Sequence, residues 1–143
     1  MKINIINKAS LDLPKYETSG SAGMDLLANV DENVTIKPME RTLVPTGLFI
    51  EIPLGFEGQV RSRSGLSIKH GICLVNGVGT IDSDYRGELK IPLINLGSEE
   101  FIVTRGMRIA QLVIARYERV EFVEVVCIDE SDRGIGGFGS TGA

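Results

Sequence analysis

The feature that most constrains the fold of this chain is the regular interruption of short β-branched runs by glycine and proline. The 143 residues include 17 glycines and 5 prolines, and few windows show the spacing of an amphipathic helix. Short apolar runs between turn residues are typical of strands. The runs are Asn4–Ile6, Val34–Ile36, Thr42–Val44, Leu48–Ile52, Leu89–Ile94, Phe101–Thr104, Ile109–Ile114 and Val120–Val125. This pattern predicts an all-β sandwich, jelly roll or barrel, with one short helix over Gly65–His70.

Length, charge and cysteine usage narrow the class of protein. A chain of this size buries roughly 68–70% of its unfolded surface, which is enough for one domain with its own core. The net charge of −4 argues against a nucleic-acid partner, and no apolar stretch approaches the ~20 residues of a membrane span. Cys73 and Cys127 show no metal-type spacing with His70. We therefore expect a cytoplasmic protein without membrane contact, in which both cysteines are small apolar core residues.

The segment Gly79–Gly87, with the sequence Gly-Thr-Ile-Asp-Ser-Asp-Tyr-Arg-Gly, has more polar groups than a turn needs. Glycines at both ends favour a sharp turn, so the segment predicts a hairpin whose tip carries chemistry. The alternative is structural, because Asp82 and Asp84 can cap such a turn through hydrogen bonds to the backbone. This segment alone does not decide between the two interpretations.

A second segment, Gly58–Ser67, runs from a predicted strand through Arg63-Ser64-Gly65 into the predicted helix. Free backbone N–H groups at a helix start, together with a hydroxyl and a guanidinium, can hold a phosphate. In the alternative, Ser64 only caps the helix, while Arg61 and Arg63 are solvated strand residues.

Two further polar residues lie among apolar neighbours. Gln111 occupies a strand position and needs partners if it is buried; it is either a core-bridging amide or a ligand contact. Asp25, within Ala22–Ala28, either supports a turn or acts on a metal ion indirectly, through water.

The composition of the C-terminal residues predicts a change from β-strands to a flexible segment. We expect the last strand to end near Ile128, so that residues 1–131 form a β domain and 132–143 a flexible tail. The tail contains five glycines, which resist ordering because of their conformational entropy. It also contains an arginine, an aromatic ring and a Ser-Thr pair, which favour a lid that closes over a ligand. A plain disordered tail is the alternative.

Five segments, in this order, resemble the motifs of the trimeric dUTP pyrophosphatases. They are Ala22–Ala28, Gly58–Ser67, Asn76–Gly87, Arg105–Leu112 and Arg133–Gly142. The resemblance implies a distorted jelly roll, or β-clip, assembled as a homotrimer with active sites shared between subunits. It further implies Mg²⁺-dependent hydrolysis of dUTP to dUMP and pyrophosphate. That reaction supplies dUMP for thymidylate synthesis and keeps uracil out of DNA.

The resemblance also assigns roles to individual residues. Asp82 matches the catalytic aspartate that activates water, and Tyr85 matches the ring that lies under the deoxyribose and excludes a 2′-hydroxyl. Asn76 and the backbone through Gly79 match the uracil-reading positions. The phosphate contacts match Arg63, Ser64 and Gly65, supported by Gln111.

By the same resemblance, Asp25 lies near the water shell of Mg²⁺, which is held mainly by the substrate phosphates. In the tail, Phe138 matches the ring that stacks on uracil. The other substrate-binding positions of the tail are Arg133, Gly139, Ser140 and Thr141.

Two other functions fit parts of the same pattern. A dCTP deaminase of the same fold needs an acid/base group, typically a glutamate, beside the C4 amine, whereas the Asp82–Tyr85 segment favours phosphate hydrolysis. A catalytically silent nucleotide-binding module is of a different class, and it has no need of Asp82 or of a complete tail.

Overall fold

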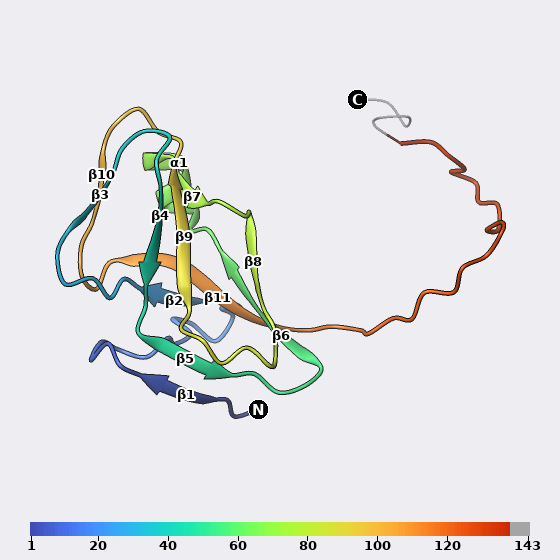
Figure 1. Cartoon of the computed structure of the whole chain (residues 1–143), viewed down its shortest axis with the longest axis horizontal. Helices are drawn as coiled ribbons and strands as arrows, with labels where there is room; N and C mark the ends of the chain where they lie inside the picture. The colour runs from blue at the N-terminus through green and yellow to red at the C-terminus, as the bar shows by residue number, and fades with distance from the viewer. Residues whose placement is uncertain (138–143) are drawn as a thin grey trace.

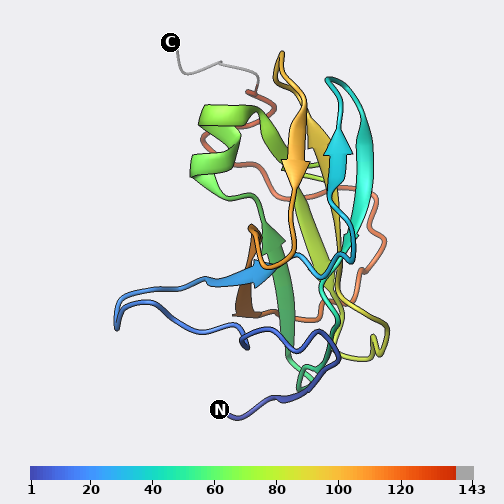
Figure 2. The same cartoon turned by 90° about the vertical axis from the view of Figure 1, so that its left-hand side faces the viewer.

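The computed structural model describes residues 1–137 and consists almost entirely of β-strands (Figures 1 and 2). The all-β prediction is confirmed. In chain order the elements are β1 (Asn4–Asn7), β2 (Met24–Leu27), β3 (Val34–Ile36), β4 (Arg41–Pro45), β5 (Leu48–Glu51), β6 (Phe56–Arg61), α1 (Ser64–His70), β7 (Ile72–Leu74), β8 (Val78–Ile81), β9 (Lys90–Asn95), β10 (Phe101–Val103) and β11 (Arg108–Arg116).

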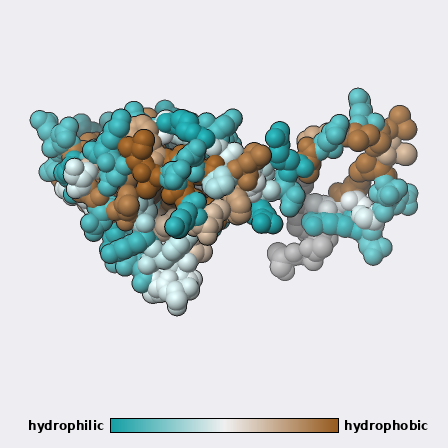
Figure 3. Space-filling model, turned by 90° about the horizontal axis from the view of Figure 1, so that it is seen from below, coloured by the Kyte–Doolittle hydropathy of each residue, from teal (hydrophilic) through white to brown (hydrophobic). Residues whose placement is uncertain are grey.

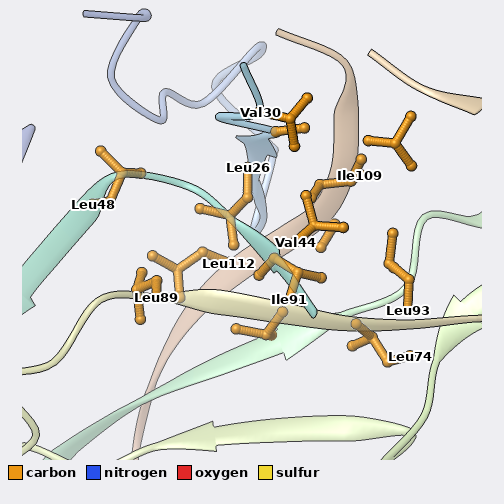
Figure 4. Close-up of a cluster of buried hydrophobic side chains, with 14 of the residues drawn as sticks. Leu26, Val30, Val44, Leu48, Leu74, Leu89, Ile91, Leu93, Ile109 and Leu112 are labelled. Atoms are coloured by element: carbon orange, nitrogen blue, oxygen red, sulfur yellow. The ribbon is translucent and has the colours of Figure 1, made fainter. Parts of the chain in front are cut away.

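The strands form a four-stranded sheet, β2-β11-β6-β8, a three-stranded sheet, β4-β9-β7, and two strand pairs, β1-β5 and β10-β3. Every pairing is antiparallel. Leu26 and Leu112 of the four-stranded sheet and Val44, Ile91 and Leu93 of the three-stranded sheet are almost fully buried. Figure 4 shows these side chains gathered in one cluster. The core between the two sheets fixes the strand ends from which the polar motif residues project.

The predicted strands agree with the structure as far as Arg116 and disagree after it. Seven of the predicted runs overlap strands, and the helix begins at Ser64, one residue before its predicted start. The strand predicted at Val120–Val125 is wrong, and so is the predicted strand end near Ile128. Within residues 1–137 the last strand is β11, and the chain then runs away from the β domain (Figure 1). The valines and the aromatic ring of Val120–Val125 give a strand preference, but within residues 1–137 no strand pairs with this segment to supply hydrogen bonds.

The placement of the cysteines is only partly as expected. Cys127 is exposed, so its prediction as a core residue is wrong, because the segment that carries it lies outside the β domain. Cys73 on β7 is partly buried.

The buried polar side chain of Asn95 has hydrogen-bond partners: its amide donates to the Ile36 and Glu99 carbonyls at 2.8 and 2.7 Å. Among the described residues, no helix is long and apolar enough to cross a membrane.

Candidate active site

Three of the predicted site residues meet around one carboxylate. Asp25 on β2 accepts a hydrogen bond from Arg63 Nε at 3.0 Å and a longer one from Gln111 Nε2 at 3.4 Å, both on Oδ1. Arg108 Nη1 lies 3.4 Å from the other oxygen, Oδ2. The side chains of Asp25 and Arg63 are only 12% and 24% exposed, so the pair is largely screened from water. We call these four residues the Asp25 cluster.

Strand register explains why these residues meet. Gln111 on β11 pairs with Asp25 on one side and with Arg61 on the other, and Arg61 pairs in turn with Val78 on β8. One row therefore crosses all four strands of the sheet. Arg63 follows two residues after Arg61, where β6 ends and α1 begins. Gln111 is only partly buried and its amide meets Asp25, so it is a polar contact at this strand row rather than an amide buried in the core.

Arg108 is a cluster residue that sequence reasoning missed. Residues three apart on a regular strand point to opposite faces, so Arg108 and Gln111 are not expected to share a partner. The register of β11 against β2 shifts between Arg108 and Ala110, which marks a bulge. The extra residue re-aims one side chain, and both residues thereby reach Asp25. A bulge of this kind leaves no clear sequence signal.

The start of α1 presents Ser64 and Gly65 to the surface. The N-cap position is Arg63, and no side chain caps the helix there, so the alternative in which Ser64 acts as the cap is wrong. Both residues are exposed, and a Cβ added to Gly65 would meet nothing within 4 Å. The backbone can therefore be approached closely at this point. Ser67 instead closes the turn, because its hydroxyl donates to the Arg63 and Ile72 carbonyls at 3.1 Å each.

Asn76, in the turn between β7 and β8, lies beside Gly79, the second residue of β8. Gly77, between them, has a φ of +71°, a backbone conformation that glycine adopts without strain. Gly79 is buried, and a Cβ built on it would lie 3.3 Å from Val60 Cβ and 3.5 Å from Asn76 Nδ2. The absence of a side chain at Gly79 leaves room beside the Asn76 amide.

Asp82 and Tyr85 follow the other end of β8, and here the hairpin prediction is wrong. The strand β8 pairs with β6, whereas β9 pairs with β4 and β7. The segment between β8 and β9 is thus a loop that passes from one sheet to the other. Its turn is closed by the Tyr85 backbone N–H, which donates to the Asp82 carbonyl at 3.2 Å. Asp82 is exposed, and within residues 1–137 its carboxylate has no ion-pair partner.

Arg86 holds this loop in shape and is another residue that sequence reasoning missed. Its Nη1 donates to the Ser83 and Tyr85 carbonyls at 2.6 and 3.0 Å. Its Nη2 lies 3.7 Å from Glu51 Oε1 on β5, although both side chains are more than half exposed. The loop carbonyls are thereby drawn together around one guanidinium.

The two groups of motif residues are far apart within one chain. Asp25 lies three strands from Val78, and Asp82 lies four residues beyond Val78 along the chain. With about 4.8 Å between strands and about 3.3 Å per residue, the Asp25 cluster and Asp82 are about 20 Å apart along the sheet. One chain therefore does not bring its general-base candidate to its own phosphate-binding candidates.

Comparison with known proteins identifies the family. The family model for dUTPase matches residues 9–142. The chain belongs to the dUTPase family. The deoxyuridine 5′-triphosphate nucleotidohydrolase of Finegoldia magna is 60% identical over 142 residues, which cover 99% of each chain. The enzyme of the same name from Fusobacterium nucleatum is 53% identical over 142 residues, which cover 99% of this chain and 97% of that protein. The dUTPase of Staphylococcus bacteriophage 80alpha, solved with dUPNHPP, is 26% identical with a TM-score of 0.91, covering 99% of each chain. The jelly-roll class expected for a dUTPase is confirmed.

The segment after β11 leads into Arg133–Gly142, the last of the five segments on which the resemblance rests. Apolar side chains along it are exposed, among them Phe122 at 93% and Val126 at 105%, and Figure 3 shows brown atoms along this segment. Arg133 lies within it, exposed, and its Nε donates to the Gly136 carbonyl at 2.9 Å. The predicted positions Phe138, Gly139, Ser140 and Thr141 lie outside the described residues. We call residues 117–137 the C-terminal arm.

Proposed function

We propose that this chain hydrolyses dUTP to dUMP and pyrophosphate in the cytoplasm, with Mg²⁺, as a homotrimer whose active sites are shared between subunits. The reaction provides dUMP for thymidylate synthesis and removes a precursor of uracil in DNA. Membership of the dUTPase family supports the substrate and the hydrolytic reaction. The observation that carries the proposal is the Asp25 cluster, which joins residues of three separate motifs at one end of the four-stranded sheet.

In the proposed reaction, Asp82 takes a proton from a water molecule as its oxygen attacks the α-phosphorus. The bond from the α-phosphorus to the bridging oxygen breaks, and pyrophosphate leaves in line with the attack. The exposed Asp82 carboxylate, free of ion pairs within residues 1–137, is available for this role. Tyr85 excludes a ribose 2′-hydroxyl by steric contact, and the Asn76 amide with the backbone at Gly79 reads the uracil edge.

The phosphate chain is assigned to Arg63, the start of α1 and Gln111. Arg63 is already oriented by Asp25, so less conformational entropy is lost when its guanidinium binds phosphate. Ser64 and Gly65 offer an exposed hydroxyl and backbone N–H groups. The positive charge of Arg63 offsets part of the negative charge of the triphosphate, which otherwise repels the Asp82 carboxylate.

The structure limits how Asp25 can serve a metal ion. Both of its oxygens already face guanidinium groups, at 3.0 and 3.4 Å, which fits an indirect contact through water better than direct coordination. Among the described residues, no group of three or more His, Cys, Asp or Glu side chains is placed to hold a metal. Mg²⁺ held by the substrate phosphates and bordered by Asp25 is therefore the arrangement we propose. When bound, Mg²⁺ neutralises part of the triphosphate charge.

The separation of about 20 Å between Asp82 and the Asp25 cluster supports the proposal that the site is shared between subunits, because it exceeds the reach of one triphosphate. A second copy of the chain supplies the missing half. The C-terminal arm supports the same assembly, because its exposed apolar side chains, such as Phe122 and Val126, need a surface that covers them. We propose that the arm carries residues 132–143 as a lid to a neighbouring subunit's site.

Pyrophosphate release from dUTP, dTTP, dCTP and UTP in the presence of Mg²⁺ tests the proposal. Release from dUTP alone is expected. Ammonia release from dCTP would instead indicate the deaminase, and tight dUTP binding without turnover would indicate a silent nucleotide-binding module. Equal release from all four nucleotides would contradict the proposed uracil and sugar selectivity.

A further inference from the structure

The ring of Tyr85 is held by the residues that follow it. Its hydroxyl donates a hydrogen bond to the Glu88 backbone carbonyl at 2.9 Å. The ring lies against Gly87, where an added Cβ would come within 2.5 Å of Tyr85 Cζ. A glycine at this position therefore makes room for the ring, and the Glu88 carbonyl fixes its outer end.

The Glu88 side chain connects this arrangement to the turn between β4 and β5. Its Oε1 accepts a hydrogen bond from the Gly47 backbone N–H at 2.8 Å, and its side chain is only 20% exposed. Gly47 has a φ of +69°, and a Cβ there would lie 2.8 Å from Ala9 Cβ, so the turn itself has little freedom. A charge-assisted bond to a backbone N–H in a shielded position is among the stronger hydrogen bonds in proteins.

The same turn also holds the peptide that accepts the tyrosine hydroxyl. The Leu89 N–H, on the far side of the peptide from the Glu88 carbonyl, donates to the Leu48 carbonyl at 2.8 Å. Two consecutive residues, Gly47 in the turn and Leu48 at the start of β5, thus hold Glu88 by its side chain and by the peptide that follows it. The position of Tyr85 is thus set through Glu88 by the turn that follows β4 and by the start of β5.

We propose that Glu88 is a positioning residue for Tyr85 and, through it, a determinant of the discrimination between deoxyribose and ribose. The inference rests on the proposed function of Tyr85. Steric exclusion of one hydroxyl group works only if the excluding ring cannot retreat, and small displacements of a positioned group have large effects. Loosening Glu88 is expected to let the ring yield to a 2′-hydroxyl, and to affect UTP more than dUTP.

The test compares kcat and KM for dUTP and UTP in Glu88→Ala and Glu88→Gln. Loss of the carboxylate in Glu88→Ala is expected to lower the dUTP-to-UTP ratio of kcat/KM by about tenfold, chiefly by improving UTP turnover. Glu88→Gln is expected to keep most of the ratio, because an amide oxygen still accepts the Gly47 N–H. Lys90→Gln is the matched control, since it removes only the 3.8 Å ion pair with Glu88 Oε2.

An unchanged ratio in folded Glu88→Ala would overturn the inference, and so would equal losses in the alanine and glutamine variants. If Glu88→Ala does not fold, Tyr85→Phe decides, because it removes the bond to the Glu88 carbonyl and leaves Glu88 in place; an unchanged ratio there also overturns it. Failure of the proposed function is distinguishable: the unmodified enzyme would then hydrolyse dUTP and UTP alike, or neither.

Discussion

Two inactive variants of this chain are expected to restore activity when they assemble together. Asp82→Asn removes the proposed general base, and Arg63→Ala removes the phosphate contact held by Asp25. Within one chain these groups lie about 20 Å apart, and in the proposed assembly each site takes Asp82 from one subunit and the Asp25 cluster from another. A hybrid assembly therefore contains some sites in which both groups are intact.

The size of the recovery follows from random assembly. In an equal mixture, half of the chains carry an intact Asp82 and the other half an intact Arg63. A given site receives both with a probability of about 25%, so activity is expected to rise from near zero to about a quarter of the unmodified level. A site built within one chain would recover nothing.

The measurement is pyrophosphate release from dUTP after the variants are unfolded together and refolded, or produced in the same cells with different tags. Purification through both tags establishes that hybrid assemblies are present. The matched control mixes the unmodified chain with a double variant carrying both changes. If the sites are shared between subunits, the activity of that mixture falls to about 25% of the unmodified level. If each site lies within one chain, the activity stays near 50%. Hybrids that form and stay inactive would refute the reasoning from strand geometry.

Three further predictions follow from the same residues. Asp82→Asn should lower kcat by about 10²–10⁴-fold while changing dUTP binding little, as loss of a general base does; calorimetry with a non-hydrolysable analogue measures the binding, and near-normal turnover would contradict the mechanism. Deleting residues 132–143 should abolish turnover yet leave the assembly intact by size-exclusion chromatography, and a monomeric product would show that this segment supports assembly instead. In urea unfolding, double-mutant cycles should give about 1.5–3 kcal/mol of coupling for Asp25 with Arg63, as for hydrogen bonds to charged groups. Coupling of Asp25 with Arg108 should stay below about 1 kcal/mol because the Arg108 side chain is 56% exposed, and equal couplings would count against this view of the cluster.

Local sequence patterns predicted much of the secondary structure. Val34–Ile36 coincides with β3, and Ile109–Ile114 lies wholly within β11, because β-branched runs between turn residues favour extended backbone in any fold. The same reasoning failed at Val120–Val125, which is also rich in valine and carries an aromatic ring. A strand also needs a partner, and the β domain of the same chain offers none at that place.

The candidate site was predicted as a set of residues but not as an arrangement. The chemistry of Asp82, Arg63 and Gln111 is visible in the sequence, because an aspartate, an arginine and an amide in these contexts suit phosphate hydrolysis. Arg108, Arg86 and Glu88 were missed, since each acts through a contact that sequence spacing does not show. Arg108 depends on a bulge in β11, and Glu88 depends on Gly47, which lies 41 residues away along the chain.

The sequence by itself determined which segments are extended, where the chain turns and which chemical groups it carries, because those properties depend on neighbouring residues. Only the tertiary structure decided which strands pair, and pairing depends on contacts between residues distant along the chain. Pairing set the row that joins Asp25, Gln111 and Arg61, and it placed β8 and β9 in different sheets. The separation of Asp82 from the Asp25 cluster follows from that pairing, and it is the basis of our proposal that a second copy of the chain completes the site.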